Sequence, residues 1–258
     1  MPASAASALA RAKERGHRLF ICTGRSAPEV YPRFFDLGFE GIVGGAGGYA
    51  AVGSTVLLDE RMPAEHVEAL TRMWEELGAF YVWQGPDQMG PSRGYLDFFV
   101  PRAGENPQDW VEYGESVTPF VVDIEGGSFT KVTAYVRPEN ASMERISAAL
   151  PNGYRAIIGS VGAAGYVPFE VLPTRLSKAV GIEAVCEHLG IPLSRSVAIG
   201  DSNNDVEAVA RAGVGISIGD GCDDLVEVAD IVAPAVGDDG FAWALAAAGL
   251  IDEAPNPA

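Results

Sequence analysis

The sequence predicts an α/β fold in which a parallel-sheet core is split by an inserted α+β domain. After Pro173, short apolar segments alternate with helical ones, which is the βα rhythm of a parallel sheet. Between Met62 and Pro173, strands rich in aromatic residues arrive in runs and outnumber the helices, as in a mostly antiparallel sheet. We therefore expect a core domain of residues 1–62 and 169–258, and an inserted domain of residues 63–168.

Composition excludes several classes of protein. A chain of 258 residues with 48% hydrophobic content can bury a large core. It carries 35 Asp and Glu against 18 Lys and Arg, a net charge of −17 without a basic cluster, so nucleic acid is excluded as a partner. The three cysteines, Cys22, Cys186 and Cys222, form no C-x-x-C pair and are expected to be free thiols of a cytoplasmic protein. No signal peptide or membrane-spanning run is predicted, and the sequence assigns no oligomeric state.

The first part of the core reads as helix, strand and turn. Residues 3–15 form a predicted helix that ends at Gly16, and residues 19–22 form a short buried strand. The strand leads into residues 23–26, after which a helix is expected to begin near Pro28. The glycine-dense residues 41–48 precede a predicted hairpin rather than a helix, which argues against a dinucleotide-binding fingerprint.

The inserted domain and the second half of the core follow in order. For the insert we expect helices at 63–77 and 139–150 and strands at 80–83, 95–100, 120–122, 129–136, 154–158 and 166–171. For the core we expect helices at 177–189, 204–212, 225–229 and 240–248, and strands at 196–199, 214–218 and 231–233. Aromatic residues of the insert either line a pocket or, more commonly, fill the core: Tyr81, Trp83, Tyr95 and Phe98.

An acidic turn, Gly200-Asp201-Ser202-Asn203-Asn204-Asp205, follows the predicted strand 196–199 and precedes a helix. Ligands bind at the carboxyl ends of parallel strands, and carboxylate and amide oxygens suit Mg²⁺ better than zinc. The alternative is a polar turn whose Asn and Asp side chains only cap the next helix.

Two further features have a phosphate-binding interpretation. Thr23 and Gly24 follow a strand, where a hydroxyl and adjacent backbone N–H groups are suited to phosphate oxygens. Lys178 stands in the first turn of a helix, where a cation opposes the helix dipole; such an ammonium can neutralise a bound phosphoryl group, but position alone favours a solvated lysine. Ordinary turn chemistry at Thr23-Gly24 and a solvated surface lysine are the alternatives.

Thr23-Gly24-Arg25, an inserted domain, Ser177-Lys178 and the acidic turn occur in this order, and Asp239-Gly240 follows. Together they resemble the haloacid dehalogenase (HAD) superfamily in its Cof-like branch, whose type IIB cap is inserted between the second and third motifs. The resemblance covers nearly the whole chain. It implies a Rossmannoid core with a cap and a magnesium-dependent phosphohydrolase that acts on a small phosphorylated metabolite, sugar phosphates by default, through an aspartyl-phosphate.

The resemblance also assigns roles to single residues. Thr23 and Gly24 would hold phosphoryl oxygens and Lys178 would neutralise their charge, so that Thr23 and Lys178 are the catalytic residues present. Asp201 and Asp205 would hold Mg²⁺. The supporting residues would be Asn204 and Arg25.

One departure from the family is severe. The family begins with a strand that ends in D-x-D-G-T and carries the nucleophile, and this chain has no such motif. The first core strand is therefore expected to be missing, with Met1 an internal methionine of a longer reading frame and no nucleophile within these residues. Asp123, in the only similar stretch, lies inside the insert and is rejected as the nucleophile. Ala46 stands where the branch often has Asn.

Two hypotheses from different classes follow. The full-length protein is a phosphatase, or the chain is a catalytically dead protein that binds Mg²⁺ and a phosphate ligand without turnover. An α/β-hydrolase or a nicotinamide enzyme is disfavoured because the sequence has no G-x-S-x-G elbow.

Overall fold

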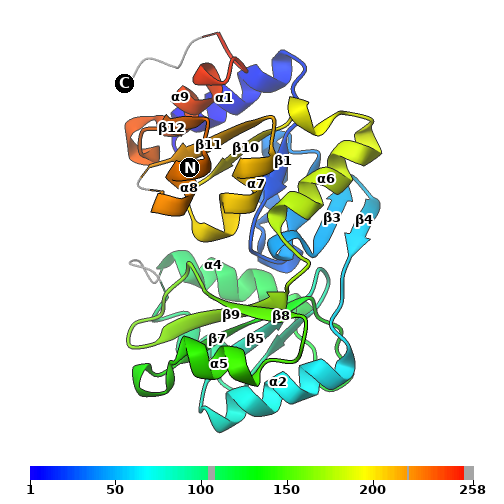
Figure 1. Ribbon diagram of the computed structural model, residues 1–258, viewed down its shortest axis with the longest axis vertical. Coiled ribbons are helices and arrows are strands. Elements are labelled where there is room, and N and C mark those ends of the chain that lie inside the picture. The colour runs from blue at the N-terminus through cyan, green and yellow to red at the C-terminus, as the bar shows by residue number, and fades with distance from the viewer. Residues whose placement is uncertain (104–107, 220, 253–258) are drawn as a thin grey trace. The chain divides into compact units, whose positions relative to one another are not determined.

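The computed structural model describes residues 1–103, 108–219 and 221–252 and divides into two compact units (Figure 1). The core unit comprises Met1–Gly24, Pro32–Leu58 and Ser177–Ala258. The insert unit comprises Arg25–Tyr31 and Asp59–Leu176. The α/β fold with an inserted unit is thus as predicted.

The unit boundaries differ from the expected ones in two places. The core was expected to resume at residue 169, but strand β9 (Val167–Pro173) pairs with β7 (Lys131–Val136) and β8 (Tyr154–Ile158) in the insert sheet. In addition, the segment Arg25–Tyr31 groups with the insert, although it directly follows the Thr23-Gly24 turn. The first difference follows from strand pairing. The second follows from contacts of Glu29 with two residues of the insert that are distant in sequence, Gln84 and Tyr113.

The strands of the core unit form two sheets. The first has the order β1 (Phe20–Cys22), β2 (Gly41–Gly44), β3 (Tyr49–Val52) and β4 (Thr55–Asp59), with β1 and β2 parallel and β2 and β3 antiparallel. The second is the parallel set β10 (Val197–Gly200), β11 (Val214–Ile218) and β12 (Ile231–Ala233). The predicted βα rhythm after Pro173 is therefore present.

The edge strands β1 and β10 are not joined by a ladder in the described part of the chain. Nevertheless they share a helical layer, because Leu19, next to β1, and Ile199 of β10 both pack against α1 (Ala3–Glu14) and α9 (Gly240–Ala247). The two helices contact each other through Ala8, Ala12, Ala242 and Leu245 (Figure 1). One helical pair thus spans both sheets.

The insert unit is built on a five-stranded sheet in the order β6 (Met89–Pro91), β5 (Phe80–Gln84), β7, β9, β8. One face packs on α2 (Ala64–Glu76) and α5 (Met143–Ala149) through Leu70, Trp74 and Ile146 (Figure 1). On the other face, α3 (Tyr95–Phe99) and α4 (Gln108–Val117) pack against Val82 and Tyr135. Four aromatic residues of the insert were expected either to line a pocket or to fill the core. All four are buried in the apolar packing on the two faces of this sheet: Tyr81, Trp83, Tyr95 and Phe98.

Two strand predictions in the insert were wrong. Residues 95–100 form helix α3, which follows Gly94 in the left-handed conformation (φ 74°) and stacks Tyr95 on Phe99 one turn later. Phe120 ends a 3-10 turn (Thr118–Phe120), Val121 forms only an isolated bridge with Met89, and residues 120–122 are exposed. Both segments have strand-like composition, but the first gains more from packing one helical face on Tyr135.

Other elements are shorter than expected or were not predicted. The helix expected at 139–150 is the shorter α5. Its N-cap residue is Ser142, whose side chain accepts a hydrogen bond from the Arg145 N–H. The helix expected near Pro28 is only a 3-10 turn, Ala27–Glu29. Helix α4 and strand β6 were not predicted, and none of the helices among the described residues is long and apolar enough to cross a membrane.

Candidate active site

Asp205 ties together the acidic turn that follows β10. Its Oδ2 accepts hydrogen bonds from the N–H groups of Asp201 (3.3 Å) and Ser202 (3.2 Å) and from Ser202 Oγ (3.1 Å). This is a capping box at the start of a 3-10 turn (Asn203–Asp205) that leads into α7 (Val206–Arg211). A Cβ at Gly200 would lie only 2.3 Å from Asp205 Cβ, so the end of β10 requires glycine.

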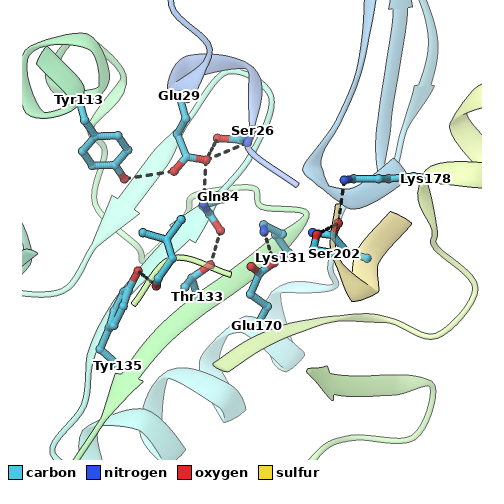
Figure 2. A network of polar contacts seen from close by, with 12 residues as sticks. Ser26, Glu29, Gln84, Tyr113, Lys131, Thr133, Tyr135, Glu170, Lys178 and Ser202 are labelled. Atoms are coloured by element: carbon cyan, nitrogen blue, oxygen red, sulfur yellow. Dashed lines mark hydrogen bonds and ion pairs between the residues drawn. The ribbon is translucent and has the colours of Figure 1, made fainter. Parts of the chain in front are cut away.

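Lys178 forms a buried ion pair with this turn. Its Nζ donates to Asp205 Oδ1 at 2.5 Å and to Asn204 Oδ1 at 2.7 Å (Figure 2 shows this side chain). Lys178 is 5% exposed and Asp205 6% exposed. A cation in the first turn of α6 (Lys178–Leu189) opposes the helix dipole, but the Asp205 carboxylate compensates its charge. The solvated-lysine alternative does not hold.

The carboxyl end of β1 lies beside the same cluster. A Cβ at Gly24 would stand 3.2 Å from Asn204 Nδ2, and the Thr23 N–H donates to the Val43 carbonyl at 2.8 Å. Burial raises the pKa of the Cys22 thiol to about 12, against an opposing effect of Lys178. The structure therefore brings the end of β1 to Lys178, Asn204 and Asp205.

The glycine-rich loop after β2 completes the backbone around the cluster. The Ala46 N–H donates to the Thr23 carbonyl at 3.3 Å, and Ala46 has a left-handed φ of 56°. A Cβ at Gly47 would lie 1.9 Å from the Ser177 carbonyl oxygen, so only glycine allows the loop to approach α6 so closely. Ser177 Oγ is buried and has no hydrogen-bond partner among the described residues.

Asp201 and Asp205 differ in what they can offer a metal ion. Both Asp205 oxygens are engaged, whereas the exposed Asp201 carboxylate makes no hydrogen bond or ion pair with any described residue. The described residues contain no group of three His, Cys, Asp or Glu side chains arranged to hold a metal. Mg²⁺ usually takes one or two carboxylates together with water and substrate phosphate, so Asp201 fits as a ligand and Asp205 fits as the residue that shapes the turn.

Arg25 is placed in the insert unit rather than with the other predicted site residues. Its guanidinium donates to the Glu29 carbonyl at 3.1 Å and lies over the rings of Tyr31 and Trp110. Ser202 and Gly47 were not predicted as site residues from the sequence. The S-x-x-D spacing of a capping box was a signal for Ser202, whereas the contact of Gly47 with Ser177 joins segments 130 positions apart and has no local signal.

Comparison with known proteins identifies the family. A family model described as haloacid dehalogenase-like hydrolase matches residues 1–245. The chain belongs to this family. The resemblance inferred from the motifs is thereby confirmed, and with it the description of the chain as a HAD-like member of the Cof-like branch.

Similar proteins cover almost the whole HAD-like chain. YkrA of Bacillus subtilis (strain 168), provisionally named a phosphatase, is 25% identical over 251 residues, which cover 97% of this chain and 92% of YkrA. A solved structure of a hypothetical protein from Geobacillus kaustophilus HTA426 is 26% identical, with a TM-score of 0.75 and coverage of 97% and 93%. The HAD subclass IIB sugar phosphatase BT4131 has a TM-score of 0.76 at 22% identity, with coverage of 97% and 93%, and shows the shared fold.

Proposed function

We propose that this protein is a Mg²⁺-dependent phosphohydrolase for small phosphate esters, with sugar phosphates as the default substrate class. The observation that carries the proposal is the buried Lys178, held by Asp205 and Asn204 where β1 and β10 end. Phosphoryl transfer depends mainly on positioned charge, and a buried cation held by two side chains supplies it.

Each residue of the chain has a distinct task in this proposal. Thr23 and its neighbouring N–H groups orient the phosphoryl oxygens, and Lys178 neutralises their charge. Asp205 fixes the Lys178 ammonium and the turn that carries Asp201. Asp201 would hold Mg²⁺, which supplies charge stabilisation for the transferred phosphoryl group.

The substrate class is supported by similar proteins. YitU of Bacillus subtilis, a 5-amino-6-(5-phospho-D-ribitylamino)uracil phosphatase, is 32% identical over 80 residues, or 31% of this chain. That compound and the substrates of a sugar phosphatase are both phosphate esters of polyhydroxylated carbon chains. We extend this class to the present protein.

We further propose that the aspartyl nucleophile is carried by a strand that pairs between β1 and β10. Among the described residues, β1 and β10 are each paired on one side only, with β2 and β11, and both border the layer of α1 and α9. An inserted parallel strand would satisfy both edges at a spacing of about 4.8 Å on each side. Its carboxyl end would then emerge beside Thr23 and Asp201.

Phosphate release from a panel of sugar and polyol phosphates, with and without Mg²⁺, tests the proposal. The 258-residue chain should bind inorganic phosphate, and a synthetic peptide with an apolar strand and D-x-D-G-T should confer Mg²⁺-dependent release. A peptide with the first Asp changed to Asn is the matched control. Equal release with both peptides, or no phosphate binding by the chain, would contradict the proposal.

The second candidate is a phosphate-binding protein without turnover, and the absence of D-x-D from the 258 residues favours it. It predicts phosphate and Mg²⁺ binding that Lys178→Met removes, with no hydrolysis by the protein in its native, full-length form. Hydrolysis by protein purified from its native source excludes this candidate.

A further inference from the structure

The chain passes from the core unit into the insert unit twice. The long passage is Asp59–Leu176, and the short one is Arg25–Tyr31. The short passage begins directly after Thr23-Gly24, the turn that we propose binds phosphoryl oxygens. A binding residue is only as well placed as the contacts that support it. The contacts of Arg25–Tyr31 therefore bear on the phosphate site.

Glu29 anchors this segment within the insert unit. Its Oε2 accepts hydrogen bonds from the N–H and the Oγ of Ser26, at 2.8 and 2.7 Å, which form a local capping box. Oε2 also accepts from Gln84 Nε2 at 2.7 Å, and Oε1 accepts from Tyr113 OH at 3.1 Å (Figure 2). Both carboxylate oxygens are thus bonded to the insert, one to β5 and the other to α4.

The donors from β5 and α4 are themselves held in place. Gln84 Oε1 accepts from Thr133 Oγ1 at 2.8 Å, which orients the amide of Gln84 toward Glu29 (Figure 2). The Tyr113 ring lies edge-on to Phe99, with 5.3 Å between the ring centroids. Burial, and then the charge of Glu29, raises the pKa of Tyr113 well above its ordinary value, so the hydroxyl keeps the proton that it donates. Glu29 therefore meets donors whose positions are set by the insert sheet and its aromatic packing.

A local cap alone does not account for these contacts. A capping box needs only Ser26 and Glu29, and its glutamate is ordinarily at the surface, whereas Glu29 is 5% exposed. The rest of the segment is held in the same unit, because the Arg25 guanidinium lies over the rings of Tyr31 and Trp110. The distant donors and the burial point to an anchor rather than to a helix cap.

We infer that Glu29 is a positioning residue, which holds the Thr23-Gly24 turn in its phosphate-binding conformation by anchoring the segment that follows. The core fixes the turn on its other side, since the Thr23 N–H donates to the Val43 carbonyl at 2.8 Å and the Ala46 N–H donates to the Thr23 carbonyl at 3.3 Å. Release of the Glu29 anchor frees the turn at one end. The effect on phosphate rests on the proposed function, whereas the effect on the turn does not.

Calorimetric titration of the full chain with inorganic phosphate, at constant MgCl₂, tests the inference. Glu29→Gln keeps the shape of the side chain but turns one acceptor oxygen into a donor that faces other donors. It should lower the affinity for phosphate about tenfold. Glu29→Gln/Gln84→Glu moves the carboxylate to β5, where it accepts from the amide at position 29 and still accepts from Thr133, so this double variant should recover most of the affinity. Unchanged affinity in Glu29→Gln would overturn the inference.

Ile146→Ala on α5 is the control for a general loss of stability. Ile146 is buried on the face of the insert sheet that packs on α2 and α5, and its truncation destabilises the insert without removing a partner of Glu29. Its affinity for phosphate should stay within about twofold of the unaltered chain. A loss as large as that in Glu29→Gln would overturn the inference. If Glu29→Gln does not fold, Tyr113→Phe, which removes a single donor, takes its place and should still weaken phosphate binding more than Ile146→Ala.

Amide hydrogen exchange followed by NMR separates this inference from the proposed function. The Thr23 N–H should exchange about tenfold faster in Glu29→Gln than in the unaltered chain, and no faster in Ile146→Ala. If inorganic phosphate does not bind to the unaltered chain, the proposed function fails and the exchange rate of Thr23 decides the inference alone. An unchanged rate in Glu29→Gln would show that the anchor does not hold the turn.

Discussion

Lys178 at the start of α6 and Asp205 at the start of α7 form an ion pair at 2.5 Å, both nearly removed from solvent. The pair joins the start of α6 to the acidic turn that precedes α7. Because Asp205 also holds the Asp201 and Ser202 N–H groups, one carboxylate sets the position of the cation and of the acidic turn.

Lys178→Met should lower the free energy of unfolding by about 3–5 kcal/mol, because it leaves the buried Asp205 carboxylate without its cation. It should also abolish inorganic phosphate binding. Urea unfolding and calorimetry measure the two effects. Lys13→Met on α1, where the lysine is exposed, is the control and should change stability by no more than about 0.5 kcal/mol. Equal effects of the two substitutions would contradict the role of Lys178.

The two aspartates should separate metal binding from stability. Asp201→Asn should weaken Mg²⁺ binding but change stability by only about 0.5 kcal/mol, since Asp201 is exposed. Asp205→Asn should cost about 3 kcal/mol or more, because it leaves the buried Lys178 ammonium without its counter-charge. Mg²⁺ titration in the presence of phosphate and thermal unfolding measure these effects. Mg²⁺ binding by Asp201→Asn equal to that of the unaltered chain would exclude Asp201 as a ligand.

Gly47→Ala should destabilise the core unit more than Gly53→Ala. Both glycines have positive φ, 93° and 54°, so each alanine meets a backbone cost of about 1–2 kcal/mol. Only at Gly47 does the new Cβ also collide with backbone, at the Ser177 carbonyl oxygen. The difference should be about 1–3 kcal/mol in urea unfolding. Similar losses at both sites would show that the loop moves away from α6 without cost.

Cys22 should resist alkylation in the folded protein. Burial raises its pKa from 9.0 to about 12, so near pH 8 only about one thiol in 10⁴ is ionised. Iodoacetamide labelling followed by peptide mass spectrometry should find Cys222 modified well before Cys22, and all cysteines modified in concentrated urea.

The same pKa shift fixes the sign of a pH effect. The folded state favours the neutral Cys22 thiol, so its contribution to stability is complete below pH 9.0 and is lost as the pH rises toward 12. Cys22→Ser should reduce this alkaline loss. An unchanged pH dependence would show that the Cys22 thiol titrates normally.

The sequence by itself determined the family and pointed to the residues that we propose for the phosphate site, because Thr23-Gly24, Lys178 and the acidic turn each follow or precede an element with a clear local pattern. Apolar strands and their following turns are local signals, and parallel strands bring their ends together in any fold of this class. The order of apolar strands and turns therefore predicted that these side chains lie at one edge of the sheet, and the ion pair of Lys178 with Asp205 agrees with that prediction.

Only the tertiary structure decided which partner each residue meets. Residues 95–100 have strand-like composition but fold as α3, because the packing of Phe98 and Phe99 on Tyr135 outweighs propensity. Arg25 is adjacent in sequence to Gly24 but groups with the insert, since its contacts are with Glu29, Tyr31 and Trp110. The pairing of Lys131 with Glu170 joins β7 to β9 across 39 positions, and strand register, which no local pattern encodes, sets that contact.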